Sequence, residues 1–192
     1  SVLLCDDATQ PPSAVRGGIA PPAPALSSLA PPNTINESRI ALAAGIAAAQ
    51  AVAAATDVRP HVRWPNDVFV GGRKLGGVLV ERRGPNGVTP AATVIGIGIN
   101  CLQQAGHFAQ SVDVTQAATS LELESKAPID RLRVARALLS SLDEWFGGVE
   151  PLDSEAMLAW WRRLSDDVGR RVTLDSAGQR VTGRMVDVNP DA

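Results

Sequence analysis

The first strong pattern of apolar positions predicts a helix from Asn36 to about Ala55. Asn36 is a residue type that commonly caps helices. One stripe of this segment is apolar at helical spacing and contains Leu42, Ile46, Ala49 and Ala53. Its other faces are mostly alanine, so we expect the helix to be buried on most of its surface.

Two further segments have the same helical period. Asp130–Phe146 carries a stripe that ends before two glycines, and Ser154–Leu164 presents a second one. The first stripe consists of Leu132, Ala135, Leu138, Leu142 and Trp145, and the second of Met157, Trp160 or Trp161, and Leu164.

Between the first helix and the later two, the apolar residues form short runs that are rich in branched side chains. Gly71-Gly72 separates two of these runs and favours a two-residue hairpin, because both positions can adopt a positive φ. The predicted strands are His61–Trp64, Val68–Val70, Leu75–Val80 and Thr93–Ile99. The pattern therefore predicts an α+β fold, with a mostly antiparallel sheet that carries helices on one face.

The two ends of the chain differ from this middle part. Residues 6–36 form a Pro-rich loop, since residues 1–36 hold seven of the fourteen prolines. After Gly169 the apolar residues alternate again, which predicts two strands joined by Ser176-Ala177-Gly178. We therefore divide the chain into residues 1–166, one α+β domain, and residues 167–192, part of a small β domain.

Composition excludes several classes of protein. The net charge of -2 and the pI near 5.7 give no electrostatic basis for binding DNA. Two cysteines and two histidines do not suffice for a disulfide framework or a zinc cluster. Cys5 and Cys101 are expected to be small apolar residues and not nucleophiles.

No targeting signal is evident, and we expect a cytoplasmic protein that is not bound to a membrane. The 17 uncharged residues between Arg39 and Asp57 are mostly alanine, which makes them too weakly apolar for a membrane span.

The block from residue 63 to residue 81 reads RWPNDVFVGGRKLGGVLVE. Pro65 favours a turn that presents Asp67 at the head of a strand, and the Gly71-Gly72 hairpin brings Lys74 back beside that strand. Gly76-Gly77 leaves the backbone free of side chains, so a phosphate or carboxylate can lie beside the lysine. The alternative is an ordinary turn and hairpin with a solvated Asp–Lys pair on the surface.

This block resembles the signature of the biotin protein ligases, in which Lys/Arg-Trp-Pro-Asn-Asp is followed by a hairpin and Lys-Leu-Gly/Ala-Gly-Ile/Val-Leu-Val-Glu. Two later segments agree in order and spacing. Gly96-Ile97-Gly98-Ile99-Asn100 resembles the Gly-x-Gly-x-Asn strand end of the family, and Ala118-Thr119-Ser120-Leu121 resembles its Ala-Thr-Ser-Leu segment.

The resemblance implies a biotin/lipoate ligase-like domain followed by an SH3-like β domain. It also implies an enzyme that couples biotin to ATP, releases pyrophosphate and holds biotinyl-5′-AMP. The biotin then passes to a lysine of a biotin carboxyl carrier protein domain, such as that of acetyl-CoA carboxylase. ATP with Mg²⁺ and biotin are thus the expected ligands, and a homodimer is a possible assembly.

By position, the resemblance assigns the catalytic roles to Lys74 and Asp67. Lys74 contacts the biotin carboxylate and the phosphate, where negative charge develops. Asp67 lies near the adenylate, either binding Mg-ATP or orienting the incoming lysine, and no firm metal site follows. The implied binding residues are Arg63, Trp64, Asn66, Lys74, Gly76, Gly77, Val78, Leu79 and Asn100, with Asn100 directed to the adenine.

The chain also departs from the family. Nothing matches the upstream Gly-Arg-Gly-Arg-x-Gly-Arg loop that closes over the adenylate, and the nearest fragment is Arg16-Gly17-Gly18. We therefore expect a fragment, with a degenerate relative as the alternative. Two other functions stay open: a lipoate or octanoate ligase-like transferase, and a non-catalytic module that binds biotin or the carrier.

The remaining candidates are expected to be structural. Trp145, Trp160 and Trp161 are expected in the core, with adenine stacking by one of them as the alternative. Glu122 and Glu124 are expected to be solvated. The basic pairs Arg162-Arg163 and Arg170-Arg171 are expected on the surface, with docking of the carrier as the alternative.

Overall fold

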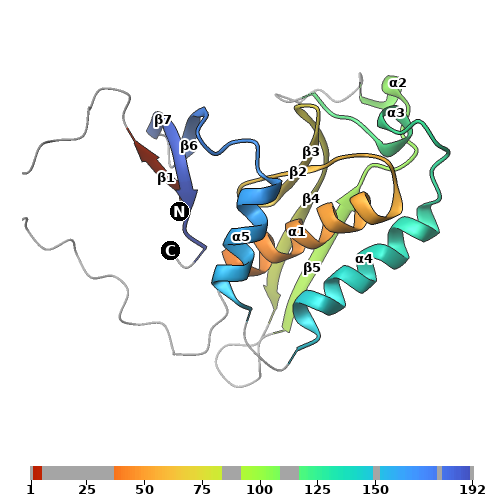
Figure 1. Cartoon of the computed structure of the whole chain (residues 1–192), viewed down its shortest axis with the longest axis horizontal. Helices are drawn as coiled ribbons and strands as arrows, with labels where there is room; N and C mark the ends of the chain where they lie inside the picture. The colour runs from red at the N-terminus through yellow and green to blue at the C-terminus, as the bar shows by residue number, and fades with distance from the viewer. Residues whose placement is uncertain are drawn as a thin grey trace, which may run out of the picture.

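A computed structural model describes residues 2–5, 37–83, 92–108, 117–148, 152–176 and 179–190. Its main sheet is antiparallel, and each strand pairs with the next one along the chain (Figure 1). The strands are β2 (His61–Arg63), β3 (Asp67–Val70), β4 (Arg73–Arg83) and β5 (Ala92–Ile99). The predicted antiparallel sheet is thus confirmed, with a longer β4 than the sequence indicated.

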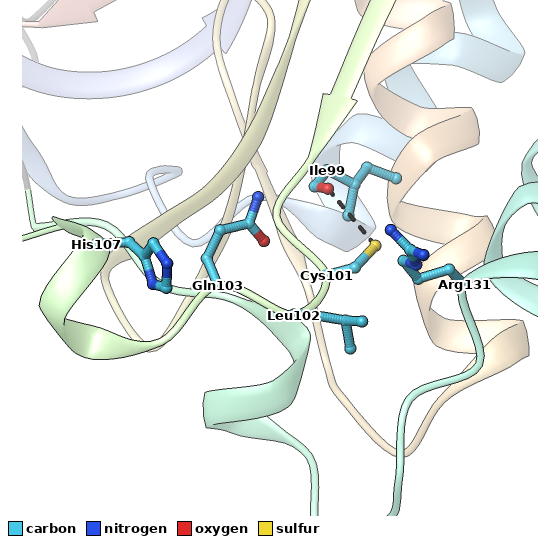
Figure 2. A pocket seen from close by; sticks show the side chains of 6 residues that line it. All are labelled: Ile99, Cys101, Leu102, Gln103, His107 and Arg131. Carbon is cyan, nitrogen blue, oxygen red and sulfur yellow. Dashed lines mark hydrogen bonds between the residues drawn. The ribbon is translucent and has the colours of Figure 1, made fainter.

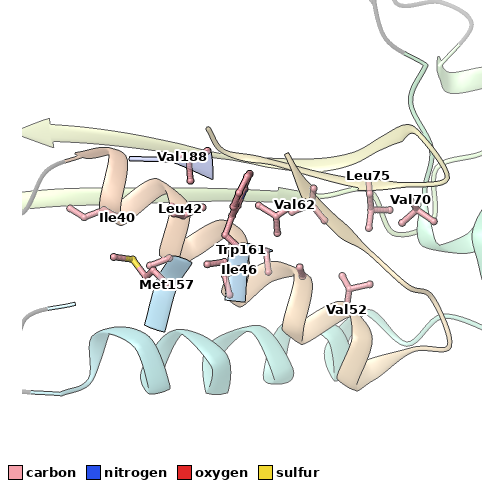
Figure 3. Close-up of a cluster of buried hydrophobic side chains, with 14 of the residues drawn as sticks. Ile40, Leu42, Ile46, Val52, Val62, Val70, Leu75, Met157, Trp161 and Val188 are labelled. Carbon is pink, nitrogen blue, oxygen red and sulfur yellow. The ribbon is translucent and has the colours of Figure 1, made fainter. Parts of the chain in front are cut away.

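The predicted helices are also confirmed as α1 (Glu37–Ala55), α4 (Arg131–Phe146) and α5 (Ser154–Leu164). Two single-turn helices, α2 (Ala105–Phe108) and α3 (Leu121–Glu124), lie in the connection between β5 and α4. Helix α1 packs against the sheet, and α4 packs on the far side of α1 (Figure 3). The described helices α1, α4 and α5 therefore lie on one face of the sheet, and no helix of the described residues covers the other face.

Helix α1 forms the centre of the core. Leu42, Ile46 and Val52 are fully buried, as are most of its alanines. Small side chains let the sheet and α4 approach α1 from opposite sides, which fits the weak amphipathicity of its sequence. The expectation that this segment is too weakly apolar for a span was wrong, because by length and composition α1 could cross a membrane; however, 72% of its most apolar window is buried inside the fold.

The sheet contributes the opposite wall of this core. Val62 and Val68 face α1 at 1% exposure, and Leu75 is fully buried. Trp161 of α5 is also fully buried, and Figure 3 shows it between α1 and the strands. This confirms the core prediction for Trp161, while Trp145 and Trp160 are partly buried against the same cluster.

A second, three-stranded sheet has the order β1-β7-β6. Its strands are β1 (Val2–Cys5), β6 (Arg171–Ser176) and β7 (Gln179–Val188). Met185 and Val188 join the main hydrophobic core, so the two sheets share buried contacts. An ion pair between Arg162 and Asp187 also connects α5 to β7, and the hydrogen bond from Arg162 to Asp187 raises the pKa of Arg162.

The small sheet confirms the two predicted C-terminal strands and adds β1, which the sequence division had grouped with residues 1–166. The boundary at residues 166 and 167 stays a prediction. The Pro-rich loop 6–36 and the turn residues 177–178 lie outside the described residues.

Candidate active site

One row of residues crosses the main sheet on the face opposite α1, which we call the open face. Arg63 of β2 is paired with Asp67 of β3, Asp67 with Gly77 of β4, and Gly77 with Gly98 of β5. Residues that are paired in antiparallel strands point to the same face, so these four lie side by side on it. The row therefore combines two charged side chains with two positions that have no side chain.

Lys74 completes this arrangement from β4. Its Nζ lies 2.6 Å from Oδ1 of Asp67, with side chains that are 41% and 21% exposed, respectively. The predicted approach of these two residues is confirmed. Ion pairs this accessible contribute about 0–1 kcal/mol to stability, so folding alone gives little reason for the pair.

Three glycines keep this face open beside the pair. A Cβ on Gly77 would lie 2.8 Å from Asp67 Oδ1, whereas a Cβ on Gly98 would meet no atom within 4 Å. Gly96 follows the same face, beside Leu79 of β4. These residues leave a flat strip of backbone, bordered by an ammonium and a carboxylate at one end and by the apolar Leu79 at the other.

The main chain of Lys74 is held by the Ala-Thr-Ser-Leu segment and by Ala117, the residue before it. Lys74 N donates to Ala117 O over 2.8 Å, and Thr119 N donates to Lys74 O over 2.9 Å. Asn100 adds a third connection, because its Nδ2 donates to Thr119 O over 3.0 Å and its N donates to Leu75 O over 2.9 Å. The three motifs found in the sequence therefore meet in space around Lys74.

The turn that precedes β3 is fixed in a similar way. Asn66 Nδ2 donates to Val78 O over 2.5 Å, and Val78 N donates to Asn66 O over 2.9 Å. Trp64 packs against the hydrophobic core, and the Trp64–Pro65 peptide bond is cis. Trp64, Asn66 and Asn100 thus have structural contacts, and the ligand contacts expected for them stay predictions.

Strand alternation separates Val78 from Leu79, both of which the resemblance implies as binding residues. Val78 is 4% exposed and belongs to the core, whereas Leu79 is 61% exposed on the open face. Gly76 is buried, and a Cβ there would lie 2.1 Å from Gly98 O, so glycine permits the close approach of β4 and β5. Gly77 and Leu79 therefore border the open face, and Gly76 and Val78 support it from within.

The sequence did not predict the contact between Glu124 and Arg73. Glu124 was expected to be solvated, but its side chain is 12% exposed and lies 2.7 Å from the Arg73 guanidinium. Thr119 Oγ1 also donates to the same carboxylate. Glu124 therefore ties the hairpin end of β4 to the loop that holds Lys74. No local signal marks this contact, because the capping-box position three residues after the N-cap Ser120 is Leu123 and not Glu124.

Arg63 turns away from the open strip. Its Nε lies 3.3 Å from Asp167 Oδ2, and its guanidinium lies 4.1 Å from the centre of the Phe69 ring. Asp167 belongs to the connection between α5 and β6 and was not a candidate in the sequence analysis. The predicted ligand-binding role of Arg63 stays a prediction, and the contact that the structure gives it is to Asp167.

A separate pocket of about 310 Å³ lies at the end of β5 (Figure 2). Its lining consists of Ile99, Cys101, Leu102, Gln103, His107 and Arg131. Burial raises the pKa of the Cys101 thiol, which favours its neutral form. That environment agrees with a small apolar role for Cys101.

Within the described residues, no group of three or more His, Cys, Asp or Glu side chains is placed to hold a metal ion. Asp67 is the carboxylate in the row that crosses the open face, and Lys74 already neutralises it.

Comparisons with known proteins agree with this arrangement. Residues 27–100 match the model of the biotin/lipoate A/B protein ligase family. The chain is 33% identical over 158 residues to the biotin--[acetyl-CoA-carboxylase] ligase of Mycobacterium tuberculosis, which covers 78% of this chain and 53% of that protein. It is 34% identical over 101 residues to the bifunctional ligase/repressor BirA of Bacillus spizizenii, covering 53% of this chain and 30% of that protein.

A solved structure of biotin protein ligase from Aquifex aeolicus has the same fold. It superposes with a TM-score of 0.66 at 22% identity, covering 81% of this chain and 65% of that chain. The two curated relatives named above are longer proteins, and the chain spans 53% and 30% of their lengths, respectively. From the family model, the relatives and the shared motifs around Lys74, the chain belongs to the biotin protein ligase family.

Proposed function

We propose that the open face of the sheet binds biotin and ATP and joins them into biotinyl-5′-AMP. The observation that carries this proposal is the Lys74–Asp67 pair beside the side-chain-free strip at Gly77 and Gly98. A solved complex of the Aquifex aeolicus enzyme, with a TM-score of 0.62, contains biotin and ATP, which supports this pair of ligands.

The chemistry of the first step matches these groups. A biotin carboxylate oxygen attacks the α-phosphorus of ATP, the bond to the β-phosphate oxygen breaks, and pyrophosphate leaves. Lys74 lies on the open face, where its ammonium can contact both the attacking carboxylate and the phosphate oxygens. Because negative charge accumulates there in the transition state, a fixed cation lowers the barrier.

Asp67 has the complementary role of positioning. Its carboxylate holds the Lys74 ammonium at 2.6 Å, which limits the orientations of a long and flexible side chain. Mg²⁺ enters this proposal with the phosphates of ATP, and Asp67 is the carboxylate beside them. The flat strip and Leu79 supply the apolar contact for the biotin rings.

In the second step, the ε-amine of a carrier lysine attacks the acyl carbon of the adenylate. AMP leaves with the electrons of the acyl–phosphate bond, and the amine loses a proton as the amide forms. We propose a biotin carboxyl carrier domain as the acceptor, because the relative from Mycobacterium tuberculosis is named for acetyl-CoA carboxylase.

The test is ATP–pyrophosphate exchange by the purified chain, with biotin, lipoate, octanoate or no acid added. The proposal predicts exchange that requires biotin. Exchange with lipoate or octanoate alone would instead indicate the other branch of the matched family. If no acid supports exchange but biotin binds in a calorimetric titration, the chain is a binding module and the catalytic proposal is wrong.

A further inference from the structure

Asp67 has two cations within reach, and only one of them is bound to it. Lys74 holds its carboxylate at 2.6 Å. Arg63 is the direct cross-strand neighbour of Asp67, and paired residues of antiparallel strands have Cβ atoms about 4.5–5.5 Å apart. Since guanidinium binds carboxylate in a bidentate manner, Arg63 is a natural competitor of Lys74 for Asp67.

The structure shows what keeps Arg63 away. Asp167 Oδ2 lies 3.3 Å from Arg63 Nε, and the Arg63 guanidinium lies over the ring of Phe69. The side chain of Asp167 is 12% exposed, so this carboxylate is better shielded from water than that of Asp67, which is 21% exposed.

The position of Asp167 is itself well determined. Its N donates a hydrogen bond to Ser165 Oγ over 3.2 Å, and its O accepts from Arg170 N over 3.0 Å. The main chain of Arg170 is in turn bonded to Met185 of β7. The carboxylate is therefore fixed by the segment that enters the small sheet.

We propose that Asp167 is a positioning residue that holds Arg63 off Asp67 and so reserves Asp67 for Lys74. The small C-terminal sheet thereby controls which cation the carboxylate of the open face binds. This inference rests on the proposed function for its catalytic consequence, but the contact itself can be measured without turnover.

The chain offers a direct probe, because its sequence contains two lysines, Lys74 and Lys126. N-hydroxysuccinimidyl acetate modifies exposed amines, and mass spectrometry gives the rate at Lys74 relative to the exposed Lys126. In Asp167→Asn, we expect Arg63 to move to Asp67 and to release Lys74. The rate of acetylation of Lys74 relative to Lys126 then rises about two- to fivefold, as expected for loss of an accessible ion pair.

Removal of Arg63 distinguishes competition for Asp67 from a general loosening of the fold as the cause of a faster reaction at Lys74. In the double variant Asp167→Asn/Arg63→Gln, the relative rate at Lys74 returns to that of the unchanged chain. Asp167→Glu keeps a carboxylate and leaves the rate unchanged. Asp166→Asn is the matched control, since Asp166 pairs with His61 at 3.3 Å and not with Arg63.

The inference is overturned if Asp167→Asn leaves the rate at Lys74 unchanged, or if the double variant stays as reactive as the single one. Circular dichroism melting of each variant shows whether the chain is folded. Biotin-dependent exchange is expected to fall about tenfold or more in Asp167→Asn. If the unchanged chain shows no exchange with biotin, the proposed function fails, and the acetylation rates still decide the role of Asp167.

Discussion

The carboxylate of Asp67 lies where a side chain at residue 77 would otherwise project, because a Cβ on Gly77 would lie 2.8 Å from Asp67 Oδ1. The same Cβ would lie 3.6 Å from Lys74 Cε. Gly77 therefore makes room for the ion pair on the open face. A glycine that looks like part of a flexible strand is a requirement of the site.

Gly77→Ala is expected to damage the site more than the fold. The added methyl group meets the end of a flexible carboxylate, which can rotate away, so the melting temperature changes little. Because Lys74 then loses its fixed partner, biotin-dependent exchange falls about 10- to 100-fold. Steady-state exchange kinetics and thermal melting, measured on the same preparation, test this. A large loss of stability with normal turnover per folded molecule would contradict it.

Gly98→Ala probes the open strip without touching the ion pair. No atom lies within 4 Å of the added Cβ, so the substitution leaves the chain folded. The methyl group would occupy the surface on which we place biotin, and a loss of about 1.4 kcal/mol in binding corresponds to a tenfold higher Kd. Calorimetric titration with biotin measures this, and an unchanged Kd would remove Gly98 from the proposed binding surface.

Asn100→Ala is expected to destabilise the loop that holds Lys74. The substitution removes the Nδ2 donor to Thr119 O and leaves that carbonyl without this partner. Loss of a partly buried hydrogen bond of this kind costs about 1–3 kcal/mol. Urea denaturation gives the free energy of unfolding, with Gln104→Ala as an exposed control in the neighbouring segment. Equal stability of the two variants would show that Asn100 is not structural.

The stability contributed by Asp57 depends on pH. Its carboxylate accepts from Ser125 Oγ over 2.6 Å and from Lys126 N over 3.1 Å, and these hydrogen bonds lower its pKa below the ordinary value of 3.8. A lowered pKa in the folded state means that the contribution is present above pH 3.8 and is lost as the pH falls through the folded value.

Asp57→Ala therefore lowers the melting temperature at pH 7, and the difference from the unchanged chain disappears in strong acid. Melting curves across this pH range, with the exposed Glu122→Ala as a control, provide the measurement. A difference that persists undiminished in strong acid would assign the effect to something other than the charge.

Local sequence signals predicted much of the central part of the site. The Gly71-Gly72 hairpin pairs β3 with β4 and places Lys74 opposite Phe69, two residues along β3 from Asp67; the register shift between Val68 and Phe69, which the sequence does not mark, puts Lys74 and Gly77 on the same face. Turn chemistry and strand alternation act over a few residues, so a single sequence contains them. The same alternation shows that Val78 faces the core, which the motif resemblance had not distinguished from Leu79.

The contacts that sequence reasoning missed join distant segments. Arg63 meets Asp167 only because α5 leads back to β2, and Glu124 meets Arg73 only because the Thr119 segment pairs with Lys74. Each of these partners is a charged residue in a polar stretch, where solvation is the ordinary expectation. Their pairing follows from tertiary packing, which no local pattern contains.

The most direct test of the account is biotin-dependent ATP–pyrophosphate exchange in two lysine variants. Lys74→Ala removes the ammonium on the open face, whereas Lys126→Ala removes the other lysine of the chain, which is exposed and lies in the turn after α3. We expect normal exchange in Lys126→Ala and a loss of about 100- to 1,000-fold in Lys74→Ala, as for other groups that stabilise transition-state charge. Exchange that survives in a folded Lys74→Ala chain would show that the adenylation chemistry does not depend on this residue.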